Sequence, residues 1–162
     1  MSAQVNYYQG KDTLHIGNEI YRISFYKHFD FTISNINNNK TDQVYYVDGT
    51  PVPLGQVFYK IENNGDNRGL WKAVRETFTA EEIAALYNER ISIGYYVYPN
   101  GTVFDVSLTI PQKELFYSLP PERWDTLIRK IKEYKKFQLS GAEKYQYVVP
   151  GGGLKFKDVY NE

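Results

Sequence analysis

The sequence predicts an α+β fold of two layers, in which an antiparallel sheet carries its helices packed on one face. Three observations in the 162-residue chain favour this class: a pair of alternating apolar runs around Asn100-Gly101, a helix-start motif at Thr79, and an amphipathic segment that begins near Pro121. The apolar stripe of a helix and the apolar face of a sheet are both buried when the two pack together.

The clearest element is a β-hairpin between Arg90 and Ile110. In the first strand, apolar residues occupy alternate positions at Ile91, Ile93, Tyr95 and Val97. In the second strand they do so at Phe104, Val106, Leu108 and Ile110. Alternating runs that flank Asn-Gly are a strong hairpin signal, because both residues tolerate the positive φ of tight hairpin turns.

Helices are expected before and after this hairpin. Thr79 and Glu82 have the spacing of a capping box, which predicts a helix over about Ala80–Glu89. Pro121 suits the first helical position, and a longer helix is expected over Glu122–Leu139, with Gly141 as its stop. Its apolar face consists of Trp124, Leu127, Ile128, Ile131 and Tyr134.

The remaining chain is assigned by composition. Residues 1–13 form a polar, loosely held tail, and residues 14–162 form a single domain with a strand-rich half (14–78) and a helix–hairpin–helix–strand half (79–162). Gly17-Asn18 indicates a first hairpin, and the Asn- and Gly-rich stretch 62–69 indicates a loop. We expect a flexible turn at Pro150–Gly153 and a terminal strand at Leu154–Lys157.

Composition excludes several classes of function. Lys+Arg and Asp+Glu both number 19, so the chain lacks the positive surplus of an ordinary nucleic-acid binder. The absence of cysteine excludes disulfides, thiolate metal sites and a cysteine nucleophile, and two histidines make a His-rich metal site improbable. No transmembrane segment, cofactor motif or catalytic set is found, so we expect neither a metal nor a cofactor.

The segment from Ile91 to Val106, with Pro99-Asn100-Gly101 at its centre, resembles the opening hairpin of TonB C-terminal-like domains. In that family an apolar strand, a Pro-Asp/Asn-Gly turn and a second strand precede a helix and a closing strand. The resemblance covers residues 90–159 and implies a β-hairpin–α–β scaffold. The membrane anchor and Pro-rich spacer of the family's energy transducers do not precede it here.

The resemblance also implies a place in the cell envelope, and the chain is similar in style to small exported proteins of Gram-negative gut anaerobes. Ser2-Ala3-Gln4 looks like the stub of a cleaved signal peptide, which favours a periplasmic or secreted protein. An ordinary cytoplasmic start is the alternative interpretation. The oligomeric state is left open by the sequence.

Two hypotheses about function come from these observations. The preferred one is a non-enzymatic binding domain that recognises a protein or a glycan through Tyr96 and Tyr98, which the alternation assigns to the exposed face, with His28 as a further candidate. The alternative is a small hydrolase-like enzyme with a site near His28 and Asp30, because histidine titrates near neutral pH.

Overall fold

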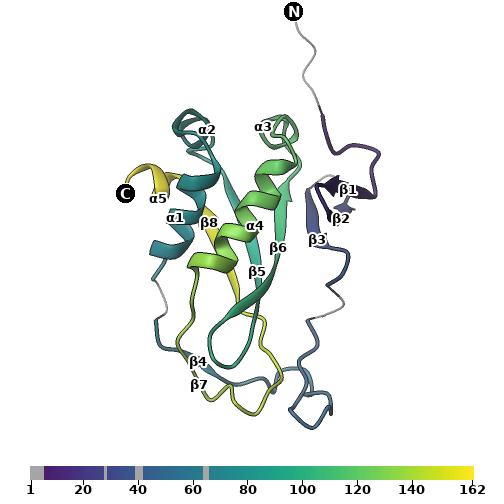
Figure 1. The fold of residues 1–162 in the computed structure, drawn as a ribbon, viewed down its shortest axis with the longest axis vertical. Helices are drawn as coiled ribbons and strands as arrows, with labels where there is room; N and C mark the ends of the chain where they lie inside the picture. Colours follow the sequence, from purple (N-terminus) through teal and green to yellow (C-terminus); the bar gives the residue numbers. More distant parts are fainter. Residues whose placement is uncertain (1–5, 28, 39–41, 64–65) are drawn as a thin grey trace, which may run out of the picture.

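The structure is a computed structural model that describes residues 6–27, 29–38, 42–63 and 66–162. Its main sheet has six antiparallel strands in the order β1-β2-β3-β6-β5-β8 (Figure 1). These strands are β1 (Thr13–Ile16), β2 (Glu19–Tyr26), β3 (Asp30–Asn35), β5 (Arg90–Val97), β6 (Val103–Pro111) and β8 (Gly151–Lys155). A small second sheet pairs β4 (Lys60–Ile61) with β7 (Leu139–Ser140).

The helices are α1 (Arg68–Thr77), α2 (Ala80–Ala85), α3 (Glu114–Tyr117), α4 (Glu122–Tyr134) and α5 (Phe156–Tyr160). Figure 1 shows α1 and α4 side by side over one face of the sheet. The predicted two-layer α+β arrangement is therefore confirmed. Trp124, Leu127, Ile128 and Ile131 are buried, as the helical spacing of the apolar residues predicted.

The β5–β6 hairpin is confirmed, although its turn is longer than two residues. The amide of Gly101 donates to the carbonyl of Tyr98 at 2.8 Å, and the amide of Tyr98 donates to Thr102 at 2.9 Å. Within this turn only Gly101 has positive φ, at 91°. A Cβ at Gly101 would also overlap the carbonyl oxygen of Phe137, so the position requires glycine for two reasons.

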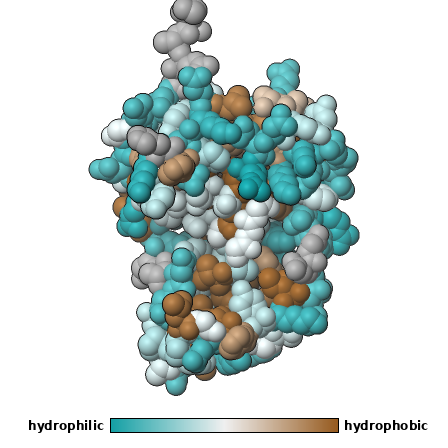
Figure 2. Space-filling view, turned by 180° about the vertical axis from the view of Figure 1, so that it is seen from behind, coloured by the Kyte–Doolittle hydropathy of each residue, from teal (hydrophilic) through white to brown (hydrophobic). Residues whose placement is uncertain are grey.

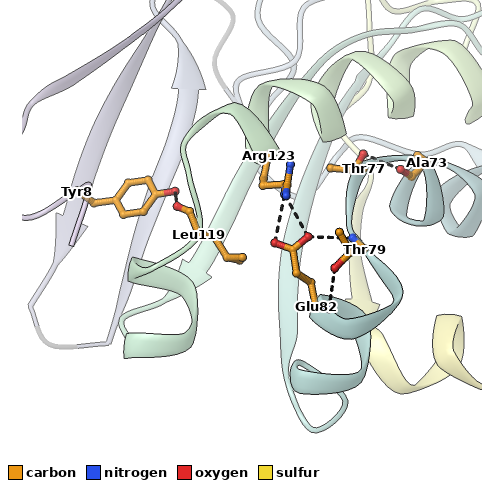
Figure 3. A network of polar contacts seen from close by, with 7 residues as sticks. All are labelled: Tyr8, Ala73, Thr77, Thr79, Glu82, Leu119 and Arg123. Atoms are coloured by element: carbon orange, nitrogen blue, oxygen red, sulfur yellow. Dashed lines mark hydrogen bonds and ion pairs between the residues drawn. The ribbon is translucent and has the colours of Figure 1, made fainter. Parts of the chain in front are cut away.

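Side-chain bonds hold the helical layer to the elements around it (Figure 3). The capping box predicted at Thr79 is formed, since Glu82 and Thr79 each accept from the other's backbone amide. The same Glu82 carboxylate accepts from Nε of Arg123 on α4 at 3.1 Å. This motif therefore starts α2 and also joins it to α4.

The described part of the expected tail is packed into the core. Tyr8 is fully buried, donates to the carbonyl of Leu119 at 2.6 Å and accepts from the indole N–H of Trp124 at 2.8 Å. Burial raises the pKa of Tyr8, and the bond from Trp124 offsets part of that increase. The expectation of a loose tail is therefore wrong at Tyr8, because a large ring with two hydroxyl bonds stabilises its docked position.

Several predicted elements differ in the structure. The strand-rich half contains helix α1, whose buried Leu70, Ala73, Val74 and Thr77 have helical spacing. Helix α4 ends at Tyr134 rather than Leu139, because Lys135 adopts an extended conformation and Phe137 turns inward to pack on Tyr95. Gly141 consequently follows β7 instead of a helix.

The last differences lie at the end of the chain. The expected turn at Pro150–Gly153 is largely strand β8, which pairs with β5 from Gly151 to Lys155. The expected strand at Leu154–Lys157 stops at Lys155, and α5 follows directly with Phe156 and Val159 buried. No helix within the described residues is both long and apolar enough to span a bilayer.

Candidate functional site

The sheet face opposite α1 and α4 is built from small and hydroxyl-bearing residues. In the β5–β6 pair, Ser92 lies opposite Thr109 and Gly94 lies opposite Ser107. Thr109 also faces Thr32 of β3, and the two hydroxyl oxygens are 3.3 Å apart. Since cross-strand partners share a face, these residues form a continuous polar floor.

A cavity of about 570 Å³ lies over this floor. Its other walls come from two segments far away in the sequence. One supplies Asp42, Val44, Val57 and Tyr59, and the other supplies Val149 and Gly151. Figure 2 views the molecule from this side and shows a hollow above a more hydrophobic lower part. The cavity has the size of ordinary small-ligand sites, which measure roughly 300–1,000 Å³.

Gly94 leaves space above the sheet in the floor of the cavity, because it has no side chain. A Cβ at this position would lie 2.6 Å from the hydroxyl oxygen of Ser107, so any side chain would displace that hydroxyl. Gly94 and Ser107, which face each other across β5 and β6, therefore shape the floor of the cavity.

Tyr96 and Tyr98 belong to an aromatic cluster farther along the β5–β6 hairpin, together with Phe104 and Tyr147, and none of these four residues lines the cavity. The prediction that both tyrosines are exposed is wrong for Tyr96, which is 7% exposed. The rings of Phe104 and Tyr147 cover it at centroid distances of 6.3 and 6.4 Å. Tyr98 is 45% exposed and stacks on Phe104 at 4.1 Å, so one aromatic platform does reach solvent.

The electrostatics of this region favour a neutral or donor-rich ligand. Burial is the main reason that the pKa of Tyr96 is raised, and the nearby carboxylates of Asp42 and Asp105 contribute to the increase. Asp105 is itself partly desolvated, which raises the pKa of its carboxyl group. No Lys or Arg is among the described residues that line the cavity, so an anion would find no charge partner there.

The candidate pair His28 and Asp30 receives no structural test as a pair. His28 lies outside the described residues. Asp30 begins β3, and its carbonyl accepts from the side-chain amide of Gln112 at 2.9 Å. It does not line any of the four described cavities.

A further observation concerns metal binding. Among the residues that the structure describes, no three His, Asp or Glu side chains gather in a way that could hold a metal ion.

The cavity over β5 and β6 was not predictable from a motif in the sequence. Its residues come from segments near 42–59, 92–94, 107–109 and 149–151, and short polar residues such as those of its floor are common on solvated strands.

Comparison with known proteins finds a solved structure with a similar fold. No protein-family model matches the chain, and no curated protein matches it in sequence. Among solved structures, it is similar to a DUF5043 family protein from Bacteroides uniformis, with a TM-score of 0.69, 18% identity and coverage of 90% of both chains. At this identity the likeness concerns the fold alone. The chain therefore shares its α+β fold with a DUF5043 family protein.

Proposed function

We propose that the chain is a non-enzymatic binding domain of the cell envelope or of a secreted protein, and that its ligand is a short neutral glycan. The observation that carries the proposal is the cavity of about 570 Å³ with a hydroxyl-lined floor. Ser92, Ser107 and Thr109 supply groups that both donate and accept hydrogen bonds, which suits a ligand with many hydroxyl groups.

The neighbouring residues support the same ligand chemistry. Tyr98 presents a half-exposed ring supported from below by Phe104, which offers a rigid apolar platform beside the polar floor. Asp42 adds a carboxylate that can accept from sugar hydroxyls. The hairpin–helix–strand order of β5, β6, α4 and β8 supports retaining the TonB C-terminal-like scaffold as part of this proposal.

The test is a titration of the full chain with neutral oligosaccharides, followed by calorimetry and by amide chemical shifts. We expect saturable binding, with shifts concentrated at Ser92, Ser107 and Thr109. Thr109→Val removes a floor hydroxyl and Tyr98→Ser removes the platform, and each should weaken binding about 10-fold, equivalent to about 1.4 kcal/mol. Tyr26→Ser, on another exposed tyrosine, is the control.

The outcomes separate the alternatives. Binding that Thr109→Val and Tyr98→Ser both leave unchanged, or the absence of binding to any neutral oligosaccharide, contradicts the glycan proposal. Release of shortened products during the titration favours the hydrolase hypothesis instead. Tyr96 is unsuited to this test, because its buried ring packs on Phe104 and Tyr147 and a truncation there would also destabilise the fold.

A further inference from the structure

A second, smaller cavity lies on the helix-covered side of the sheet, at the edge formed by β8. It measures about 220 Å³ and shares only Gly151 with the lining of the proposed glycan site. Its lining includes Tyr95, Lys135, Asn67 and the three glycines Gly151–Gly153. Ile61, Asn63 and Phe137 complete the lining, and the Asn63 amide already bonds the backbone at Lys136 and Gln138. Two other side chains, those of Tyr95 and Lys135, are hydrogen-bond donors with capacity left for a ligand.

Tyr95 is the first of these groups. The residue is 3% exposed, its ring packs edge-on against Phe137 at a centroid distance of 5.1 Å, and a Cβ at Gly152 would lie 3.2 Å from the ring. Its hydroxyl group has no hydrogen-bond partner among the described residues. No fully buried side-chain oxygen among the described residues lacks a hydrogen-bond partner, so this hydroxyl opens on the cavity, where it is a donor available to a ligand.

Lys135 is the second group. It is 7% exposed, and its ammonium donates one hydrogen bond, to the carbonyl of Asp66 at 2.8 Å, while lying 4.9 Å from the centre of the Phe137 ring. No carboxylate of the described residues lies within 4 Å of it. The Asp66 carboxylate is engaged by Arg68 through two bonds of 3.0 Å.

A buried ammonium with one neutral acceptor is costly, because desolvation removes its water and a single carbonyl replaces little of it. Its three donors are not all used. Burial also lowers the pKa of Lys135, while the charge of Asp66 opposes that change. An anion in the cavity would offset the cost of this buried charge.

The start of α1 contributes to the same cavity. Asn67 precedes the helix, and its side chain makes no capping bond to the helix amides. The first turn carries no acidic residue, and the Asp66 carboxylate just before the helix accepts from the backbone amide of Arg68 at 3.3 Å while it is also paired with the Arg68 side chain. Lys72 and Lys136 line an adjoining cavity of about 480 Å³ together with Lys135, which adds positive charge on the approach.

We propose that the cavity between Tyr95, Lys135 and the start of α1 binds a small oxyanion, such as a phosphate or carboxylate group. The Tyr95 hydroxyl and the Lys135 ammonium donate hydrogen bonds to its oxygens, and Asn67 contributes its amide. The size of the cavity fits one such group and its waters, or the acidic end of a small molecule.

The test titrates the full chain with inorganic phosphate and, separately, with succinate, followed by amide chemical shifts and calorimetry. We expect saturable binding of at least one of these anions, with shifts at Asn67, Tyr95 and Gly151–Gly153. Tyr95→Phe and Lys135→Met should each weaken this binding about 10-fold or more, and Lys11→Met, on an exposed lysine that lines none of the described cavities, should change it less than about 3-fold. Comparison of the two anions tells which oxyanion class the cavity prefers.

Thermal unfolding provides a readout that does not depend on a binding signal. Without anion, Lys135→Met should raise Tm or leave it unchanged, since the buried unpaired charge is removed. With saturating anion, the wild type should gain stability that the Lys135→Met variant does not gain, because a ligand stabilises the folded state that binds it. The proposal is overturned if neither anion binds saturably, or if Lys135→Met and Tyr95→Phe bind as the wild type does.

Discussion

On the face that α1 and α4 cover, β5 and β6 bury Ile93 and Leu108, and on the other face the adjacent residues are Gly94 and Ser107. The same two strands therefore supply an apolar surface for the core and a polar surface for the larger cavity. One residue along a strand reverses the face, so a period of two separates residues that stabilise the fold from residues that are free to bind. The comparison predicts that substitutions on neighbouring residues have very different effects.

The largest expected difference is between Leu108→Ala and Ser107→Ala. Leu108 is completely buried, and its truncation leaves a cavity in the core, which should lower the free energy of unfolding by about 2–5 kcal/mol. Ser107 lies on the open face, and its truncation should change stability by less than about 1 kcal/mol. Urea denaturation of both variants measures the contrast. If the two variants lose equal free energy of unfolding, Ser107 stabilises the fold as much as Leu108 does, which would contradict the contrast between the two faces.

The next largest effect is a loss of stability at alkaline pH. It tests the comparison because the tyrosines that cause it lie on the helix-covered side of the sheet. Burial raises the pKa of Tyr8, Tyr21 and Tyr95, and the bond that Tyr21 donates to Asp125 raises the pKa of Tyr21 further. Below pH 10 these groups are neutral in both states. Above it the unfolded chain loses protons that the folded chain retains, so stability decreases as the pH rises.

Each such tyrosine contributes a slope of about 1.4 kcal/mol per pH unit above pH 10. Tyr95→Phe should therefore reduce the slope by about that amount in denaturation measured between pH 10 and 11. Tyr98→Phe, on the exposed ring of the other face, is the matched control. A Tyr95→Phe variant with the slope of the wild type would contradict the assignment.

The smallest expected effect concerns the N-terminal cap of the short helix α2. Thr79→Ala removes the cap of α2 and should lower stability by about 1 kcal/mol. Ser92→Ala, on the open face, should change it by less than about 0.5 kcal/mol. Hydrogen exchange of the α2 amides would localise the difference. If those amides exchange as slowly in Thr79→Ala as in the wild type, the capping box is unimportant for α2.

Local sequence patterns were sufficient to predict the elements that depend on local interactions. The hairpin around Asn100-Gly101 and the box at Thr79 were predictable, because each needs residues only a few positions apart. Helix α1 was missed because Gly69 and the Asn-rich stretch before it indicate a loop. Gly69 is there because a Cβ would overlap the Tyr134 carbonyl oxygen, a contact between two helices that no local pattern contains.

The sites depend on contacts between distant segments, for which local sequence patterns are weaker predictors. Gly151–Gly153 has the composition of a turn, yet it pairs with β5 and admits the ring of Tyr95. Tyr96 alternates to the polar face as predicted, but Phe104 and Tyr147 cover it there. Lys135 follows the charged pattern of its helix, and its burial arises only where the chain turns back past Asp66.

The hydroxyl of Tyr8 joins the first described residues to the indole of Trp124, which is completely buried. This link makes the chain's own fluorescence a reporter on its N-terminal segment. The chain has two tryptophans, and the other, Trp71, is only partly buried. In a Trp71→Phe variant, the indole N–H resonance and the emission of Trp124 would follow undocking of Tyr8 separately from unfolding of the whole domain.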